Sequence, residues 1–174
     1  MLKIINYFIE LCLLKRAPQD LPASVALLVI VITLNILIGA LGVADLMDNS
    51  SALSAAVLDT LIIMVLLRVV LIVQSRSSRY LQTATAIFGS GIFLGLLGLL
   101  LQFSAANAAP ESFIESFTAV VYFVLFIWVQ LVIGQILKHA LDVSMNLGVG
   151  LALTYTILSG MMIQMIFLTP SVTS

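Results

Sequence analysis

Residues 22–44 read PASVALLVIVITLNILIGALGVA, an uninterrupted stretch without a charged side chain. As a helix, an apolar run of this length crosses a hydrocarbon core of about 30 Å. Four further runs, also mostly apolar, lie at residues 51–73, 82–102, 113–137 and 146–168. The sequence therefore predicts an all-α fold, a polytopic membrane bundle of five transmembrane helices.

The composition of the whole chain supports this prediction and excludes several functions. Of 174 residues, 62% are hydrophobic and 9% are charged, whereas soluble domains are about half apolar and about a quarter charged. Seven Lys and Arg stand against eight Asp and Glu, so the chain has no basic surface for nucleic acid. One Cys and one His argue against a structural zinc site. We predict no metal, no cofactor and no nucleic-acid partner.

Residues 1–17 precede the first span and are predicted to form a short amphipathic helix in the membrane interface. At 100° per residue, Lys3, Asn6 and Glu10 fall on one side of this helix and apolar residues cover the other. A helix packed on the bundle explains the same pattern equally well. Two prolines then break the chain, and residues 18–174 are predicted to form one membrane domain.

The positions of the cations predict the orientation of the chain. In a five-span arrangement, every Lys and Arg outside the spans falls on one side: Lys3, Lys15, Arg16, Arg76, Arg79 and Lys138. Short loops rich in Lys and Arg stay in the cytoplasm. We therefore predict a cytoplasmic N-terminus and a C-terminus on the far side. A four-span alternative, with a re-entrant third segment, would place Arg79 and Lys138 on opposite sides.

Asp59 lies deep inside the second predicted span, where an ionisable side chain costs roughly 2.5 to 3.5 kcal/mol. It is about 12 Å from the far end of that helix at the helical rise. By the same count, Asn35, Tyr122 and Ser159 lie about 13.5 Å from the far ends of their own spans. We predict that these four residues, here called the polar layer, form a hydrogen-bonded structural lock. A proton or cation site that uses the Asp59 charge is the alternative.

The third predicted span carries Gly91, Gly95 and Gly98 on one face, here called the glycine face. Small residues at this spacing allow two membrane helices to approach closely, so we predict a packing surface. The alternative is a nucleophile at Ser90 with His139 as its base. The sequence shows neither a third group nor an oxyanion donor for such a site.

A polar stripe runs along the fourth predicted span and continues beyond its cytoplasmic end. It is formed by Trp128, Gln135, His139 and Asp142, which fall within about 60° of one another around the helix. A His three residues before an Asp is typical of a solvated or ion-paired helix end. Ligand binding, or acid–base chemistry on a lipid, is the alternative.

Two stretches and the order of the spans resemble a known family. The stretches are RYLQTATAIFGSGIFLGLL at 79–97 and FIWVQLVIGQILKHALDVSMNLGVGLAL at 126–153. This layout is similar to the Yip-domain family, five-span membrane proteins that interact with Ypt or Rab GTPases. Its eukaryotic members carry a long polar cytoplasmic region before the first span, which this sequence lacks. The resemblance therefore implies the bacterial branch of the family and a bacterial cytoplasmic (inner) membrane, with no carried-over site residue.

Taken together, these features predict a non-enzymatic membrane protein that acts as a scaffold, assembly factor or accessory subunit. Its expected partners are membrane lipids and other integral membrane proteins, or a second copy of the chain. The short loops leave no room for a water-soluble active site. A small transporter or channel component that uses Asp59 is the first alternative, and a lipid-modifying enzyme is the second.

Overall fold

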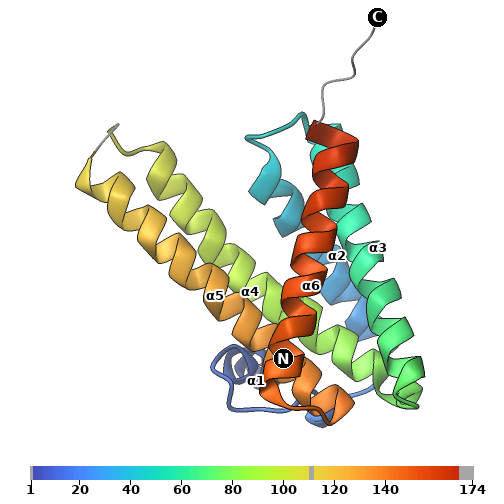
Figure 1. The fold of residues 1–174 in the computed structure, drawn as a ribbon. Helices are drawn as coiled ribbons and strands as arrows, with labels where there is room; N and C mark the ends of the chain where they lie inside the picture. The colour runs from blue at the N-terminus through green and yellow to red at the C-terminus, as the bar shows by residue number, and fades with distance from the viewer. Residues whose placement is uncertain (1, 110–111, 169–174) are drawn as a thin grey trace, which may run out of the picture.

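A computed structural model describes residues 2–109 and 112–168, and all regular structure within them is helical (Figure 1). The α-helices are α1 (Leu2–Cys12), α2 (Val25–Val43), α3 (Asn49–Val73), α4 (Tyr80–Ala106), α5 (Phe113–Leu141) and α6 (Met145–Ile163). Single turns of other helix types are η1 (Pro18–Asp20), η2 (Ser77–Arg79) and η3 (Gln164–Leu168). Residues 169–174, the end of the predicted membrane domain, lie outside the described residues. The predicted all-α membrane fold is confirmed, because α2 to α6 are each long and apolar enough to cross a membrane.

Polar side chains at the helix ends explain where the spans begin and end. Ser24, Asp48, Ser112 and Ser144 each accept a hydrogen bond from a backbone N–H of the first turn of α2, α3, α5 and α6. Asp142 ends α5 in the left-handed conformation, with φ 57°. Apolarity alone does not locate such caps. The observed helices therefore differ from the predicted spans by a few residues at most ends.

Four of the five spans form two diverging pairs, α4 with α5 and α3 with α6, and α2 is the fifth. α4 packs against both α2 and α5, while α3 packs against α2 and α6. Figure 1 shows the α4–α5 pair leaning away from α3 and α6 toward the end where α4 turns into α5. The tightly packed core therefore lies at the opposite end, where the most buried large side chains include Leu71, Val132 and Ile136.

The contact between α5 and α6 depends on two glycines. A Cβ atom at Gly148 would lie 2.3 Å from the carbonyl oxygen of Gly134. A Cβ atom at Gly134 would lie 2.5 Å from Cγ2 of Val149 and 2.9 Å from its backbone nitrogen. The two helices therefore touch backbone to backbone, a contact that only small residues permit.

α1 packs on the bundle against α4 and α5. Phe8 and Leu11 are buried, and the Phe8 ring occupies the space above Gly89, where a Cβ atom would lie only 2.0 Å from the ring. On the other side of α1, Ile5 and Ile9 stay exposed. The helix expected at residues 1–17 is thus an extension of the bundle that also leaves an apolar face uncovered.

One end of the bundle gathers the described Lys and Arg residues that lie outside the spans. The segments that meet there follow α1, join α3 to α4 and end α5 (Figure 1). Arg79 Nη1 donates to the carbonyl oxygen of His139 at 3.0 Å, and Gln19 Nε2 donates to the same oxygen at 2.6 Å. We call this the cationic end and the opposite one the far end. Within α3, Arg68 lies over the Tyr80 ring, 5.2 Å from its centroid.

Candidate functional site

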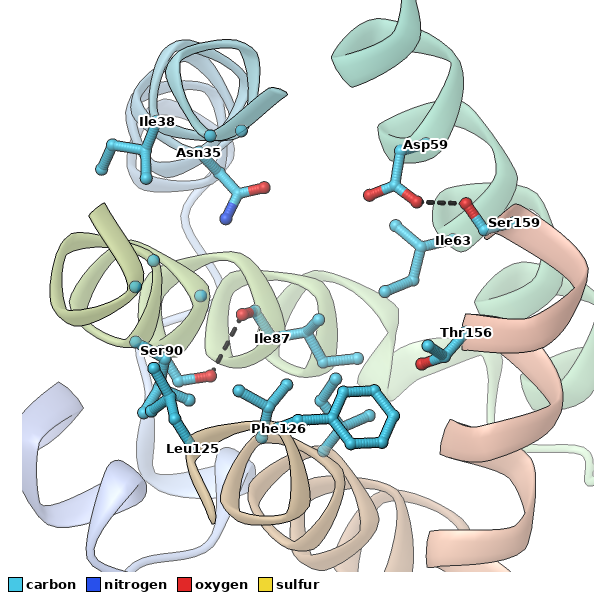
Figure 2. Close-up of a pocket in the computed structure, with 18 of the residues that line it drawn as sticks. Asn35, Ile38, Asp59, Ile63, Ile87, Ser90, Leu125, Phe126, Thr156 and Ser159 are labelled. Carbon is cyan, nitrogen blue, oxygen red and sulfur yellow. Dashed lines mark hydrogen bonds between the residues drawn. The ribbon is translucent and has the colours of Figure 1, made fainter. Parts of the chain in front are cut away.

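All five spans line one cavity of about 490 Å³. This volume falls within the range of small-molecule sites, roughly 300 to 1,000 Å³. Most of the wall is apolar and includes Ile38, Leu94 and Phe126. Each member of the polar layer also lines the cavity: Asn35, Asp59, Tyr122 and Ser159. The structure therefore brings four residues that are distant in the sequence to one site. Figure 2 labels three of them, Asn35, Asp59 and Ser159.

Asp59 reaches the cavity from α3 and is held by two hydroxyl groups of α6. Tyr155 donates a hydrogen bond of 2.7 Å to Oδ1 of Asp59, and the Ser159 hydroxyl donates to the same oxygen. Figure 2 shows the other carboxyl oxygen pointing into the cavity. Within the described part of the chain, Oδ2 receives no hydrogen bond and no cation pairs with it. One oxygen thus joins two helices, and the other is left for the cavity.

Small residues fix the position of α3 beside this site. Ala52, Ala55 and Ala56 are buried on the face that carries Asp59. A Cβ atom at Gly39 of α2 would lie 3.6 Å from the Cβ atom of Ala56, which is ordinary van der Waals contact. Because these side chains are short, α3 lies close to α2 while Asp59 faces α6.

Asn35 faces Asp59 from α2 (Figure 2). Its Nδ2 atom donates to the carbonyl oxygen of Phe88 in α4, at 3.4 Å. Gly91 provides the space for this amide, since a Cβ atom there would lie 2.5 Å from Nδ2. The amide oxygen, by contrast, points toward the Asp59 side of the cavity and accepts no hydrogen bond from any described residue.

The glycine face meets two different helices. Gly91 and Gly95 lie against α2, because a Cβ atom at Gly95 would come within 2.7 Å of Ile38 Cγ2. Gly98 instead faces α5, where a Cβ atom would lie 3.8 Å from the Tyr122 hydroxyl oxygen, an ordinary contact distance. All three glycines also line the cavity. They therefore set its width as well as the contact between helices.

The polar layer is one group of neighbours but not one hydrogen-bonded network. Asp59 and Ser159 are joined directly, whereas Asn35 is bonded to a backbone carbonyl. Tyr122 is half exposed and makes no side-chain hydrogen bond to another described residue. The structure thus joins two of the four predicted side chains and places the other two across the cavity from them.

Several polar residues of the cavity were not anticipated from the sequence. Tyr155 lies four residues before Ser159 on α6, so helical spacing could have placed both hydroxyl groups on one face. Gln130 of α5 and Thr156 of α6 are also bonded to each other, with Gln130 Nε2 donating to Thr156 Oγ1 at 3.1 Å. Near the far end, Gln102 donates to Asp45, and its own carbonyl oxygen is buried without a partner in the described structure.

The polar stripe of α5 forms hydrogen bonds and an ion pair that connect the segments at the cationic end of the bundle. Trp128 Nε1 donates to the carbonyl oxygen of Cys12 at 2.9 Å, which holds the end of α1. His139 Nδ1 lies 2.9 Å from the carbonyl oxygen of Gln135. Asp142 forms an ion pair with Arg76, at 2.7 Å. His139 and Asp142 share no hydrogen bond or ion pair in the described structure, so the geometry gives an acid–base pair no support.

The two remaining reactive groups near α1 are buried. Ser90 is the residue considered as a nucleophile, and its hydroxyl donates to the carbonyl oxygen of Ile87 at 3.1 Å (Figure 2). Cys12 lies beside Ser90, with its sulfur 3.7 Å from the Ser90 carbonyl oxygen. Burial raises the pKa of the Cys12 thiol from 9.0 to about 11. Cys12 is therefore a thiol near neutral pH, and the Ser90 hydroxyl is engaged with the backbone of its own helix.

The cavity can orient a ligand through a few oxygen atoms and hold the rest of it by apolar contact. No cluster of three or more His, Cys, Asp or Glu residues is placed to bind a metal ion within the described ranges. The site is thus defined by Asp59 and its neighbours on α2 and α6. Comparisons of the chain with protein-family models, with curated proteins and with solved structures found no match.

Proposed function

We propose that this integral membrane protein is a non-enzymatic binding protein, a scaffold, assembly factor or accessory subunit that holds a component of the membrane in its central cavity. The observation that carries the proposal is the composition of the cavity wall. All five spans contribute to it, and several of its hydroxyl and amide groups are engaged in contacts between helices. The oxygen atoms that these contacts leave free, with the apolar wall around them, can hold a ligand in place, and this is a binding role.

The exposed outer half of α5 supports the scaffold part of the proposal. Near the far end, α5 lies beside α4 and apart from α6 (Figure 1). Phe113, Phe117 and Phe123 are exposed there. Inside a membrane, a helix surface of this kind faces either lipid or the helix of another protein. A partner therefore has both an outer surface and a cavity to bind.

The orientation and location of the protein belong to the same proposal. The cations of the cationic end favour a cytoplasmic location for that end. With the resemblance to the bacterial branch of the Yip-domain family, this favours a bacterial cytoplasmic membrane. The N-terminus is then cytoplasmic, and the last span ends on the far side.

Site-specific photo-crosslinking in native membranes tests this proposal. The photoreactive amino acid p-benzoyl-phenylalanine is placed at Phe126, which lines the cavity, or at Phe123, which is exposed on the same helix but does not line it. We expect a discrete crosslinked species from position 126 and only scattered lipid adducts from position 123. If the two positions give the same products, the cavity holds nothing specific and the proposal fails.

A second function, transport of a proton or cation, is favoured by one observation, the free carboxyl oxygen of Asp59 that faces the cavity. Transport would need the charge of Asp59, whereas a scaffold needs only its hydrogen bonds. The two functions are separated by measuring ion flux in liposomes for the wild type and for Asp59→Asn. Flux that the Asn variant abolishes, with the fold intact, would establish transport and displace the scaffold proposal.

A further inference from the structure

Among the oxygen atoms of the cavity that accept no hydrogen bond from a described residue, two face each other across its width. One is Oδ2 of Asp59 on α3, and the other is the amide oxygen of Asn35 on α2 (Figure 2). Each residue is held in place through its other polar atom, by Tyr155 and Ser159 or by the carbonyl oxygen of Phe88. Two acceptors that are fixed in this way suit a ligand that donates hydrogen bonds to both.

The charge of the site points to a cationic ligand. Asp59 forms no ion pair with any described residue. Arg68 is on the same helix but lies over the Tyr80 ring, 5.2 Å from its centroid, on the face opposite to Asp59. A carboxyl group in an apolar region needs a partner to remain charged, and a donor cation supplies both the charge and the hydrogen bonds.

The size and lining of the cavity favour an organic cation over a bare ion. A volume of about 490 Å³ greatly exceeds the space of one ion, and much of the lining is aliphatic or aromatic. A second, almost entirely apolar cavity of about 110 Å³ adjoins the first, and both are lined by Ile63, Ile87, Ile133 and Tyr155. Beyond the Asp59 site, there is therefore room for a hydrocarbon chain.

We infer that the cavity binds a hydrophobic amine, with a compact ammonium head between Asp59 and Asn35 and an apolar body along the remaining wall. The ammonium group donates to Asp59 Oδ2 and to the Asn35 amide oxygen, and the hydrocarbon chain runs past Ile63 and Ile87 toward the second cavity. This inference rests on the proposed binding function and names the chemical class of its ligand.

Thermal unfolding of the purified full-length chain in dodecyl maltoside micelles tests the inference. Dodecylamine, which carries an ammonium group at pH 7, is compared with dodecanol, dodecanoic acid and dodecyltrimethylammonium. We expect the primary amine to raise the unfolding temperature in a saturable manner. The alcohol and the acid lack the charge or carry the wrong one, and the trimethylammonium compound cannot donate a hydrogen bond, so each should bind at least about tenfold more weakly.

Variants locate the binding to the predicted atoms. Asp59→Asn should weaken dodecylamine binding at least about tenfold, because a charged hydrogen bond is lost. Asp48→Asn is the matched control, since it removes an exposed carboxylate at the N-cap of the same helix, outside the cavity, and Asn caps a helix as well as Asp does. Asn35→Leu tests the second acceptor and keeps the inference testable if the Asp59 variant does not fold. Equal responses to amine and alcohol, or an Asp59→Asn or Asn35→Leu variant that binds the amine like the wild type, would overturn it.

Crosslinking separates this inference from the proposed function. If dodecylamine does not bind while Phe126 still captures a discrete component, the inference fails and the proposed function stands. If the captured component is a protein, the inference is also overturned, because a partner side chain then occupies the site. If dodecylamine, added before irradiation, prevents the capture of a small molecule at position 126, both are supported. If position 126 captures nothing that position 123 does not, both fail.

Discussion

At the scale of single residues, Asp59 illustrates how one oxygen atom can stabilise a membrane bundle. Its Oδ1 atom receives hydrogen bonds from Tyr155 and Ser159 and so joins α3 to α6. In Asp59→Leu, both hydroxyl groups would lose this acceptor in an apolar region. We expect the free energy of unfolding to fall by about 1 to 3 kcal/mol, measured by reversible denaturation in mixed micelles.

The matched control for this prediction is Asp59→Asn, which keeps an acceptor oxygen at the same position. Its amide should leave both hydroxyl groups bonded, so its stability should stay near that of the wild type. A Leu variant as stable as the Asn variant would show that the two hydrogen bonds do not hold α3 against α6.

The thiol of Cys12 provides a second prediction at this scale. Because burial raises its pKa to about 11, very little thiolate exists at pH 8, and thiolate is the reactive form. We expect slow alkylation by iodoacetamide in the folded protein, with a rate that rises about tenfold per pH unit between pH 8 and 10. Unfolding in sodium dodecyl sulfate should restore ordinary reactivity.

The comparison for Cys12 is a variant that carries Cys12→Ser together with Ala105→Cys, which places the only thiol at an exposed position near the end of α4. Its alkylation should be fast at pH 8 and should level off above pH 9. If Cys12 reacts as quickly as this exposed thiol in the folded state, α1 does not stay packed against α4.

At the scale of helices, the contact between α5 and α6 depends on Gly148. In Gly148→Ala, the added methyl group would lie 2.3 Å from the Gly134 carbonyl oxygen, and only a shift of one helix can relieve this contact. We expect a loss of about 1 to 3 kcal/mol of stability, measured by thermal unfolding in detergent. Gly150→Ala is the control, because nothing lies within 4 Å of a Cβ atom there. Equal stability of the two variants would contradict the observed contact.

The same pair of glycines shows where sequence analysis of helices stops. A span is recognisable from its own residues, because continuous apolarity is a local property, and all five spans were predicted for this reason. The contact of Gly134 with Gly148 belongs to two helices at once, and nothing in either sequence says which face meets the other. The glycine face was recognised because Gly91, Gly95 and Gly98 lie in one helix, but its two partner helices were not.

At the scale of the whole molecule, the gathering of cations predicts the orientation in the membrane. A reporter that is active only outside the cytoplasm should be active when fused after Leu168 and silent when fused after Arg79. Both fusion points follow complete helical segments, so the preceding spans are retained. Measuring reporter activity together with fusion-protein abundance checks the prediction, and the reverse pattern would overturn the proposed orientation.

The cavity is the feature of the whole molecule that sequence reasoning reached only in part. Counting residues from the helix ends placed Asn35, Asp59, Tyr122 and Ser159 at a common depth, and all four line the cavity. Depth along a helix says nothing of distance across the bundle, however. The cavity between these residues arises because α4 and α5 lean away from α3 and α6. This divergence depends on packing at the cationic end.

The lean of α4 and α5 also leads us to expect a response of the protein to the thickness of its bilayer. α5 has 29 residues and α2 has 19, which correspond to lengths of about 43 Å and 28 Å. A hydrocarbon core of about 30 Å fits α2 when upright, whereas α5 fits only when it is tilted. We expect a thicker bilayer to let the longer pair stand more upright and to narrow the space beside Asp59, and a thinner one to widen it. In that case the thickness of the host membrane controls access to the cavity.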